Sequence, residues 1–175
     1  MKQPTIKTKK FILRPFKLGD ARELAKKLND KEISQNMTAI PYPYSLQDAR
    51  NWLNKVIKEK RKKDPENLVF AIEVNGELAG TILLVRLKKA HKAELGYWMA
   101  KEFRGKKLMT SAIKEVCKYC FNELKLKRIA AKIFISNPAS WRVLEKNGFE
   151  LEGVLRKEAK KGNKYIDSYL MAKVK

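Results

Sequence analysis

Residues 94–109 read ELGYWMAKEFRGKKLM, and residues 137–149 read NPASWRVLEKNGF. These two stretches decide the fold. The first is a strand that runs into a basic Arg-Gly turn and then into a long helix. The second is a polar loop that begins a short helix, and Gly148 stands where a left-handed helix cap is expected. Because the free N–H groups of a first helical turn bind phosphate readily, two such turns can hold the two ends of one long ligand.

Outward from these stretches, apolar spacing and turn signals predict the remaining elements. Asn75-Gly76 indicates a hairpin, because a type I′ turn needs positive φ at both central residues. Asp20 with Glu23, and Ser45 with Asp48, are expected to begin two helices as capping boxes. Strands are predicted at 11–16, 68–74, 78–85, 91–99, 129–135, 149–157 and 165–172, and the two later helices at 106–125 and 139–147.

The predicted order is β-α-α-β-β-β-α-β-α-β-β, an α/β architecture with helices on a mixed sheet. The strand–helix–strand unit from 91 to 135 should place two parallel strands together through a right-handed crossover. The sequence contains no repeat, long linker or low-complexity block, so residues 1–175 are expected to form a single domain.

The charge of the chain is strongly positive, with 40 Lys+Arg against 19 Asp+Glu and a net charge of +21. Such a field attracts polyanions, including nucleic acid, a ribosome surface, anionic lipid, acidic proteins and CoA, without choosing among them. No apolar run approaches the roughly 20 residues that cross a bilayer, so no membrane association is predicted. The N-terminus has charge but no apolar segment typical of a secretory signal, and a cytoplasmic location is expected.

Cys117 and Cys120 are the two cysteines, and they form a CKYC motif. This spacing could indicate a redox pair or half of a metal site. Both residues, however, fall on the apolar stripe of the helix at 106–125, where thiols pack as small hydrophobic groups. A zinc site would need two further ligands, and His91 is the single histidine, so no metal is predicted.

The two stretches occur together, in order and at compatible spacing, and the chain resembles the GNAT superfamily of N-acetyltransferases. Within it, the chain is most similar to the branch of Rim-type ribosomal-protein N-terminal acetyltransferases. The resemblance covers nearly the whole chain. It is also carried by FILRP at 11–15, FAIE at 70–73, GELAG at 76–80, AELGYW at 93–98 and EGVLR at 152–156.

The resemblance implies the GNAT fold and an acetyl-CoA site where the strands at 91–99 and 129–135 splay apart. Pantetheine is expected to bind backbone groups near Trp98, Met99 and Ala100, with Asn137 as a further polar contact. Ser140 is expected near the thioester sulfur. The pyrophosphate is expected on the turn formed by Arg104, Gly105, Lys106, Lys107, Leu108, Met109 and Thr110.

The chain departs from the family pattern at Lys107 and Leu144. Lys107 stands where a second glycine is usual, and we expect it inside the start of the helix rather than at a position of positive φ. Leu144 stands where many members carry a tyrosine that acts as general acid. That role therefore passes to Ser140, which we predict to protonate the departing thiolate.

The resemblance implies direct transfer of an acetyl group to an amine, and Glu94 is the candidate general base. The alternative for Glu94 is a solvent-facing strand residue, since reach to the amine has to be shown. Three functions stay open: a protein N-terminal acetyltransferase, a small-molecule amine acetyltransferase, and a non-catalytic ribosome- or RNA-binding module. A ribosome or an acidic protein is a further expected partner, and the protein is expected to be a monomer or a homodimer.

Overall fold

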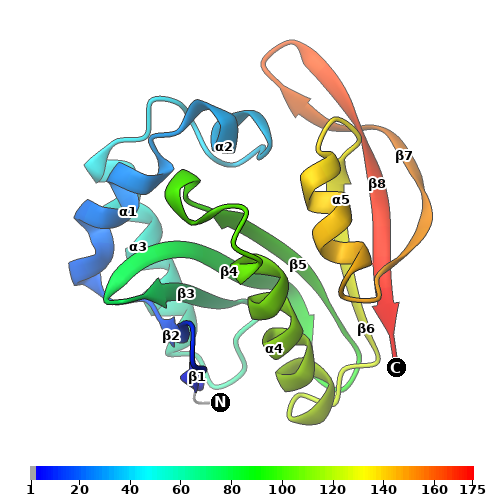
Figure 1. The fold of residues 1–175 in the computed structure, drawn as a ribbon, viewed down its shortest axis with the longest axis horizontal. Helices are drawn as coiled ribbons and strands as arrows, with labels where there is room; N and C mark the ends of the chain where they lie inside the picture. Colours follow the sequence, from blue (N-terminus) through cyan, green and yellow to red (C-terminus); the bar gives the residue numbers. More distant parts are fainter. Residues whose placement is uncertain (1–2) are drawn as a thin grey trace.

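The computed structural model describes residues 3–175 and contains one mixed sheet flanked by helices, as the sequence predicted (Figure 1). The strand order is β1-β2-β3-β4-β5-β6-β8-β7. The strands are β1 (Ile6–Lys7), β2 (Ile12–Pro15), β3 (Leu68–Val74), β4 (Glu77–Lys88), β5 (Lys92–Met99), β6 (Arg128–Phe134), β7 (Glu150–Lys161) and β8 (Lys164–Val174). The α-helices are α1 (Ala21–Leu28), α2 (Lys31–Gln35), α3 (Leu46–Lys60), α4 (Leu108–Asn122) and α5 (Pro138–Glu145).

The sheet is antiparallel except between β5 and β6, which α4 connects as a parallel pair. These two strands pair only at Lys92–Arg128, Ala93–Ile129 and Glu94–Ala130. Beyond Glu94, β5 stays bonded to β4 as far as Met99, while β6 stays bonded to β8 as far as Phe134. The two strands therefore diverge into the predicted split, which is visible in Figure 1.

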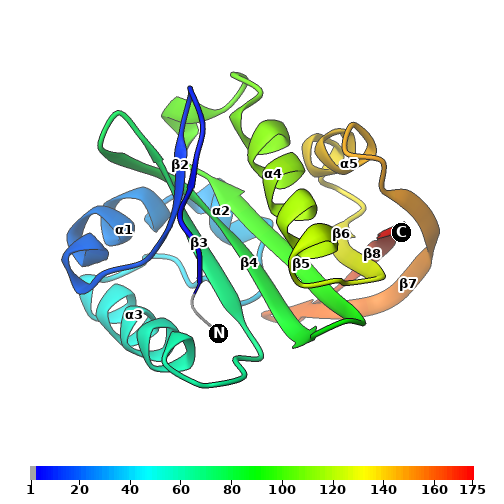
Figure 2. The same cartoon turned by 90° about the horizontal axis from the view of Figure 1, so that it is seen from below.

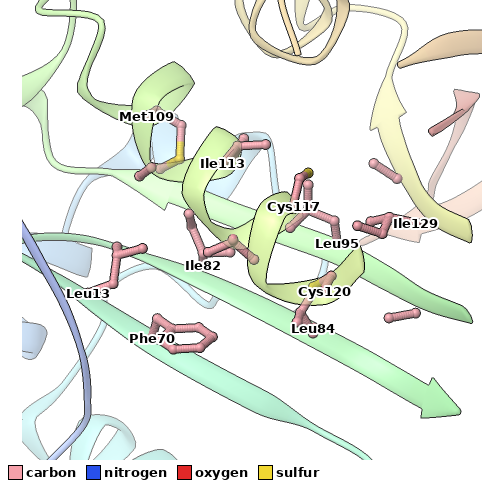
Figure 3. Packing of buried hydrophobic residues seen from close by; sticks show 14 of the residues in the cluster. Leu13, Phe70, Ile82, Leu84, Leu95, Met109, Ile113, Cys117, Cys120 and Ile129 are labelled. Carbon is pink, nitrogen blue, oxygen red and sulfur yellow. The ribbon is translucent and has the colours of Figure 1, made fainter. Parts of the chain in front are cut away.

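Helices cover both faces of the sheet (Figure 2), and β3 and the first half of β4 are buried on both faces. On one face, α4 packs its apolar stripe onto the sheet, and Met109, Ile113 and Cys117 point toward Ile82 and Leu95 in Figure 3. On the other face, α1 and α3 pack Leu24 and Leu53 against Leu78 and Trp98. Both clusters fix β5, so its free end is held rigidly beside the split.

Cys117 and Cys120 are free thiols buried in the α4 core, as the helical spacing predicted (Figure 3). Burial raises the pKa of Cys117 to about 11 and that of Cys120 further, so both stay protonated at neutral pH. Protonated, buried thiols are poor nucleophiles and poor metal ligands. The two cysteines thus act as core residues.

The start of the first helix differs from its prediction. Asp20 begins α1 without a side-chain cap, and its carboxylate instead accepts two hydrogen bonds from Arg14 at 2.9 Å. Glu23 likewise reaches away from the helix and accepts a bond from the N–H of Leu78. Asp20 is the last residue of a 3-10 turn, Leu18–Asp20, and its carboxylate also accepts from the N–H of Lys17 at 2.9 Å, so the helical path begins before Asp20. The expected box at Ser45 and Asp48 is present. The short elements β1 and α2 were not predicted.

Candidate active site

A cavity of about 410 Å³ occupies the split between β5 and β6. Its walls come from the free end of β5, the start of α4, the end of β6 and the first turn of α5, and α2 borders it on a further side. Ten residues that the sequence analysis placed at the acetyl-CoA site line this cavity: Trp98, Met99, Arg104, Gly105, Lys107, Leu108, Met109, Thr110, Asn137 and Ser140. The structure thus brings the two quoted stretches to one place.

The turn before α4 contains two residues in the left-handed region, Gly105 at φ +75° and Lys107 at φ +58°. The prediction that Lys107 lies inside the helix was wrong, because Lys107 is the residue before the first helical turn and α4 begins at Leu108. The N–H groups of the first turn of α4 have no partner within the helix, and the residues that carry them, Leu108, Met109 and Thr110, line the cavity. A lysine in this conformation costs about 1 kcal/mol or more.

Arg104 lines the cavity, but its guanidinium is already bound to protein groups. It donates to the carbonyl of Met99 at 3.0 Å and forms ion pairs with Glu32 at 2.6 Å and Asp30 at 3.1 Å. Arg104 therefore joins the end of β5 to α2 and holds one wall of the cavity. Its predicted contact with a pyrophosphate would compete with these carboxylates.

Two of the predicted binding residues lie outside the cavity lining. Ala100 is buried, and its N–H donates to the carbonyl of Ala79 at 2.9 Å, so this group is not free to bind pantetheine. Lys106 is exposed and its ammonium lies 5.8 Å from the ring centre of Phe103. Neighbouring residues of a turn point in different directions, which the spacing alone does not reveal.

Ser140 lies in the first turn of α5 and faces Tyr97 on β5 across the split. The Ser140 hydroxyl and the Tyr97 phenol are 2.6 Å apart, and the phenol is also 3.1 Å from the Ser140 carbonyl. Asn137 begins α5, and its side-chain oxygen accepts from the N–H of Ser140 at 3.1 Å. The Asn137 amide thus fixes the turn that carries Ser140.

Tyr97 also lines the cavity, and the sequence analysis assigned it no role. Burial raises the pKa of its phenol well above the usual range, although the hydrogen bond with Ser140 acts in the opposite direction. Strand alternation could have placed Tyr97 on the face of Leu95 and Met99, toward α4. Leu144, at the position of the family tyrosine, is fully buried in the core.

Glu94, the predicted general base, lies outside the cavity lining, at the last pair before β5 and β6 diverge. Its carboxylate accepts a hydrogen bond from Arg86 at 2.8 Å and is 27% exposed. Trp141 is also outside the lining and packs edge-to-face on Tyr169 at 4.9 Å. Trp141 therefore packs against the core rather than forming a wall of the cavity.

The side of the cavity next to α2 is formed by that helix and the segment that follows it, and the β7–β8 hairpin contacts this segment from outside the lining. Ile33, Asn36 and Met37 line the cavity. From the end of β7, Lys161 donates to the carbonyl of Met37 at 3.0 Å and to the Ser34 hydroxyl at 3.2 Å. Lys132 also lines the cavity and forms an ion pair with Glu158 of β7.

Within residues 3–175, no group of three or more histidine, cysteine or acidic side chains is arranged to hold a metal ion. No helix in the same range is long and apolar enough to cross a membrane.

Comparison with known proteins agrees with this geometry. Residues 10–150 match the family described as acetyltransferase (GNAT) domain. The probable N-acetyltransferase YjcK of Bacillus subtilis is 30% identical over 172 residues, which are 95% of each chain. The ribosomal-protein-serine acetyltransferase of Escherichia coli is 30% identical over 141 residues, 74% of this chain and 79% of that protein.

A solved structure supports the fold independently. The microcin C7 self-immunity acetyltransferase MccE, crystallised with acetyl-CoA and AMP, superimposes with a TM-score of 0.85 over 96% of this chain and 94% of MccE. At 24% identity, this likeness concerns the fold. The chain belongs to the GNAT family of acetyltransferases, and it is an N-acetyltransferase of that family.

Proposed function

We propose that this protein transfers an acetyl group from acetyl-CoA to the α-amino group of a protein N-terminus, with residues 1–175 acting as one catalytic domain. The single observation that carries this proposal is the cavity in the β5–β6 split, with the turn before α4 at one side and Ser140 at another. The similarity to a ribosomal-protein-serine acetyltransferase supports the acceptor, and MccE supports the donor.

The donor would lie along the free end of β5. Backbone groups of Trp98 and Met99 would bind the pantetheine, and the side chain of Asn137 would contact the same arm. The turn at Gly105 and Lys107, with the first N–H groups of α4, would hold the pyrophosphate. The net charge of +21 favours a donor that carries several phosphates.

The acceptor must be a neutral amine when it attacks. An α-amino group has a pKa of about 7.7–8.0, so roughly a tenth of it is neutral at pH 7, against less than a thousandth of a lysine side chain at about 10.4. A protein N-terminus therefore needs less help from a base than a lysine does. The positive charge of the chain also disfavours polyamines and favours an acceptor on the ribosome or on an acidic protein, both met in the cytoplasm.

In the proposed reaction, the amine nitrogen attacks the thioester carbonyl carbon, a C–N bond forms, and the carbonyl oxygen gains negative charge. Backbone N–H groups near Met99 would stabilise this oxyanion. Collapse breaks the C–S bond, and the departing thiolate takes the proton of the Ser140 hydroxyl, which then recovers one from water. Glu94 would accept the proton of the amine through water, because its carboxylate does not line the cavity.

The test is the release of free CoA thiol from acetyl-CoA with three acceptors: a peptide with a free N-terminus, the same peptide with a blocked N-terminus, and a panel of small amines. We expect release with the free peptide alone, and a mass gain of one acetyl group at its N-terminus. Release that requires a small amine would favour the small-molecule function. Absence of release with every acceptor would contradict the enzymatic proposal.

A further inference from the structure

We propose that Tyr97 is a positioning residue that holds the hydroxyl of Ser140 so that its proton points into the cavity. This inference rests on the proposed function, in which Ser140 protonates the departing thiolate. Tyr97 itself would neither contact the sulfur nor lose its proton.

The position of Tyr97 suits this role, because the residue lies on the part of β5 that has left β6. The last β5–β6 pair is Glu94–Ala130, and Tyr97 follows it on the free arm of the split. Ser140 belongs to the other arm, in the helix that follows β6. The 2.6 Å contact between the two side chains therefore joins the arms across the cavity that both residues line.

The acceptor of the Tyr97 proton determines where the Ser140 proton can point. Tyr97 has one proton and two nearby acceptors, the Ser140 carbonyl at 3.1 Å and the Ser140 hydroxyl oxygen at 2.6 Å. If the phenol donates to the carbonyl, the serine proton must point at the phenol oxygen to satisfy the shorter contact. If the phenol donates to the hydroxyl, the serine proton is free for a third acceptor.

A thiolate in the cavity selects the second arrangement. The sulfur carries negative charge and needs a donor, and Ser140 can serve it when Tyr97 supplies the other hydrogen bond of the hydroxyl. The 2.6 Å contact is made in both arrangements, and the thiolate decides which of the two hydroxyl groups donates in it. Tyr97 thus sets the direction of the serine proton.

The phenol keeps its proton over the pH range of the reaction. A free tyrosine has a pKa of about 10, and burial raises the pKa of Tyr97 above that. A phenol that stays neutral donates a hydrogen bond at every working pH and is a poor acid. These properties fit a fixed hydrogen-bond donor to the Ser140 oxygen.

The ring of Tyr97 also packs against the core beneath α4, so a packing role has to be separated from the hydrogen bond. Tyr97→Phe keeps the ring and removes the hydroxyl. Tyr119→Phe is the matched control, because Tyr119 packs against the same core and lies outside the cavity lining.

The experiment is a double-mutant cycle with Tyr97→Phe, Ser140→Ala and the double variant, assayed with a free N-terminal peptide. We expect Tyr97→Phe to lower kcat about tenfold, the effect of losing one hydrogen bond. Its KM for acetyl-CoA should stay within about twofold of the wild type, because the substitution removes a hydrogen bond between two side chains and no contact with acetyl-CoA. In the Ser140→Ala background, Tyr97→Phe should cause no further loss, because its target is gone.

Other outcomes would overturn the inference. An equal loss in both backgrounds would assign Tyr97 to packing, and wild-type kcat in Tyr97→Phe would remove it from the reaction. Binding of acetyl-CoA measured by calorimetry, together with the Tyr119→Phe control, shows whether the variants are folded. If Ser140→Ala lowers turnover but Tyr97→Phe does not, the role of Tyr97 is contradicted while the proposed function stands. If the wild type acetylates no acceptor, the proposed function fails with it.

Discussion

Lys107 holds a backbone conformation in which glycine would be unstrained. At φ +58° and ψ 12° its side chain crowds the following carbonyl, and this strain costs roughly 1–2 kcal/mol. Part of that cost would be offset in a glycine variant by the larger backbone entropy of the unfolded chain. The lysine therefore supplies positive charge to the turn before α4 at the expense of stability.

We expect Lys107→Gly to raise the free energy of unfolding by about 0.5 to 1 kcal/mol, because strain relief exceeds the entropy loss. Urea denaturation measures this change. Lys106→Gly is the control, since it removes a lysine from the same turn at a residue without positive φ, and it should give no gain. A Lys107→Gly variant less stable than the wild type would show that the strain is not released.

Glu94 can be tested against a closely similar ion pair elsewhere. Glu94 is 27% exposed and bonded to Arg86 at 2.8 Å, and Glu115 on α4 is 28% exposed and bonded to Lys118 at 2.9 Å. If Glu94 takes the amine proton through water, Glu94→Gln should lower the rate mainly below pH 8, where most of the α-amino group is protonated. Glu115→Gln should leave the pH–rate profile unchanged. Equal profiles for both variants would exclude Glu94 from the reaction.

At the scale of elements, the β7–β8 hairpin and the segment after α2 meet at Lys161. Its ammonium donates to Ser34 and Met37 and has lost part of its hydration, which lowers its pKa. Met37 lines the cavity, so Lys161, on the edge strand β7, holds that wall of the cavity in place. We propose that the acceptor enters beside Ile33 and Met37, and that Lys161 supports this side of the cavity from the hairpin.

We expect Lys161→Ala to raise the KM for the peptide acceptor severalfold and to leave the KM for acetyl-CoA unchanged, because the proposed acetyl-CoA contacts lie on β5, α4 and the start of α5. Steady-state kinetics with each substrate varied in turn measures both. Lys160→Ala is the control, since the neighbouring lysine is exposed and lies over the Tyr165 ring at 5.6 Å instead. A rise in both KM values would indicate a general loss of structure rather than a change in the acceptor wall.

The elements themselves were predictable where a local pattern decides them. Alternation and the Asn75-Gly76 turn predicted the β3–β4 hairpin, and the strand–helix–strand unit predicted the parallel pair. The split between the two strands was expected from the family resemblance. Local patterns failed where distant groups compete. Glu23 bonds the N–H of Leu78, 55 positions away, and Asp20 bonds Arg14 and the N–H of Lys17 instead of capping α1. Tyr97 was not assigned to the site for the same reason, because its partner Ser140 lies 43 positions away.

Across the whole molecule, the amino-acid composition gives the net charge but not the positions of the charged groups. Two of the basic groups beside the cavity are paired with carboxylates. Arg104 pairs with Asp30 and Glu32, and Lys132 pairs with Glu158. The remaining positive charge is spread over the surface, and its effect on a ligand is a long-range field. Such a field raises the association rate of a ligand that carries several phosphates, without contributing a specific contact.

This field predicts how the enzyme responds to salt. From about 10 mM to about 150 mM salt, the Debye length falls from roughly 30 Å to roughly 8 Å, so the attraction of distant lysines for the phosphates of acetyl-CoA is screened. We expect kcat/KM for acetyl-CoA to fall severalfold over this range while kcat stays constant, because the chemical step takes place inside the cavity. Acetyl-pantetheine lacks those phosphates and is the control, so its kcat/KM should change little. If both donors lose activity in parallel, salt acts on the acceptor or on the fold, and the net charge of +21 does not steer the donor.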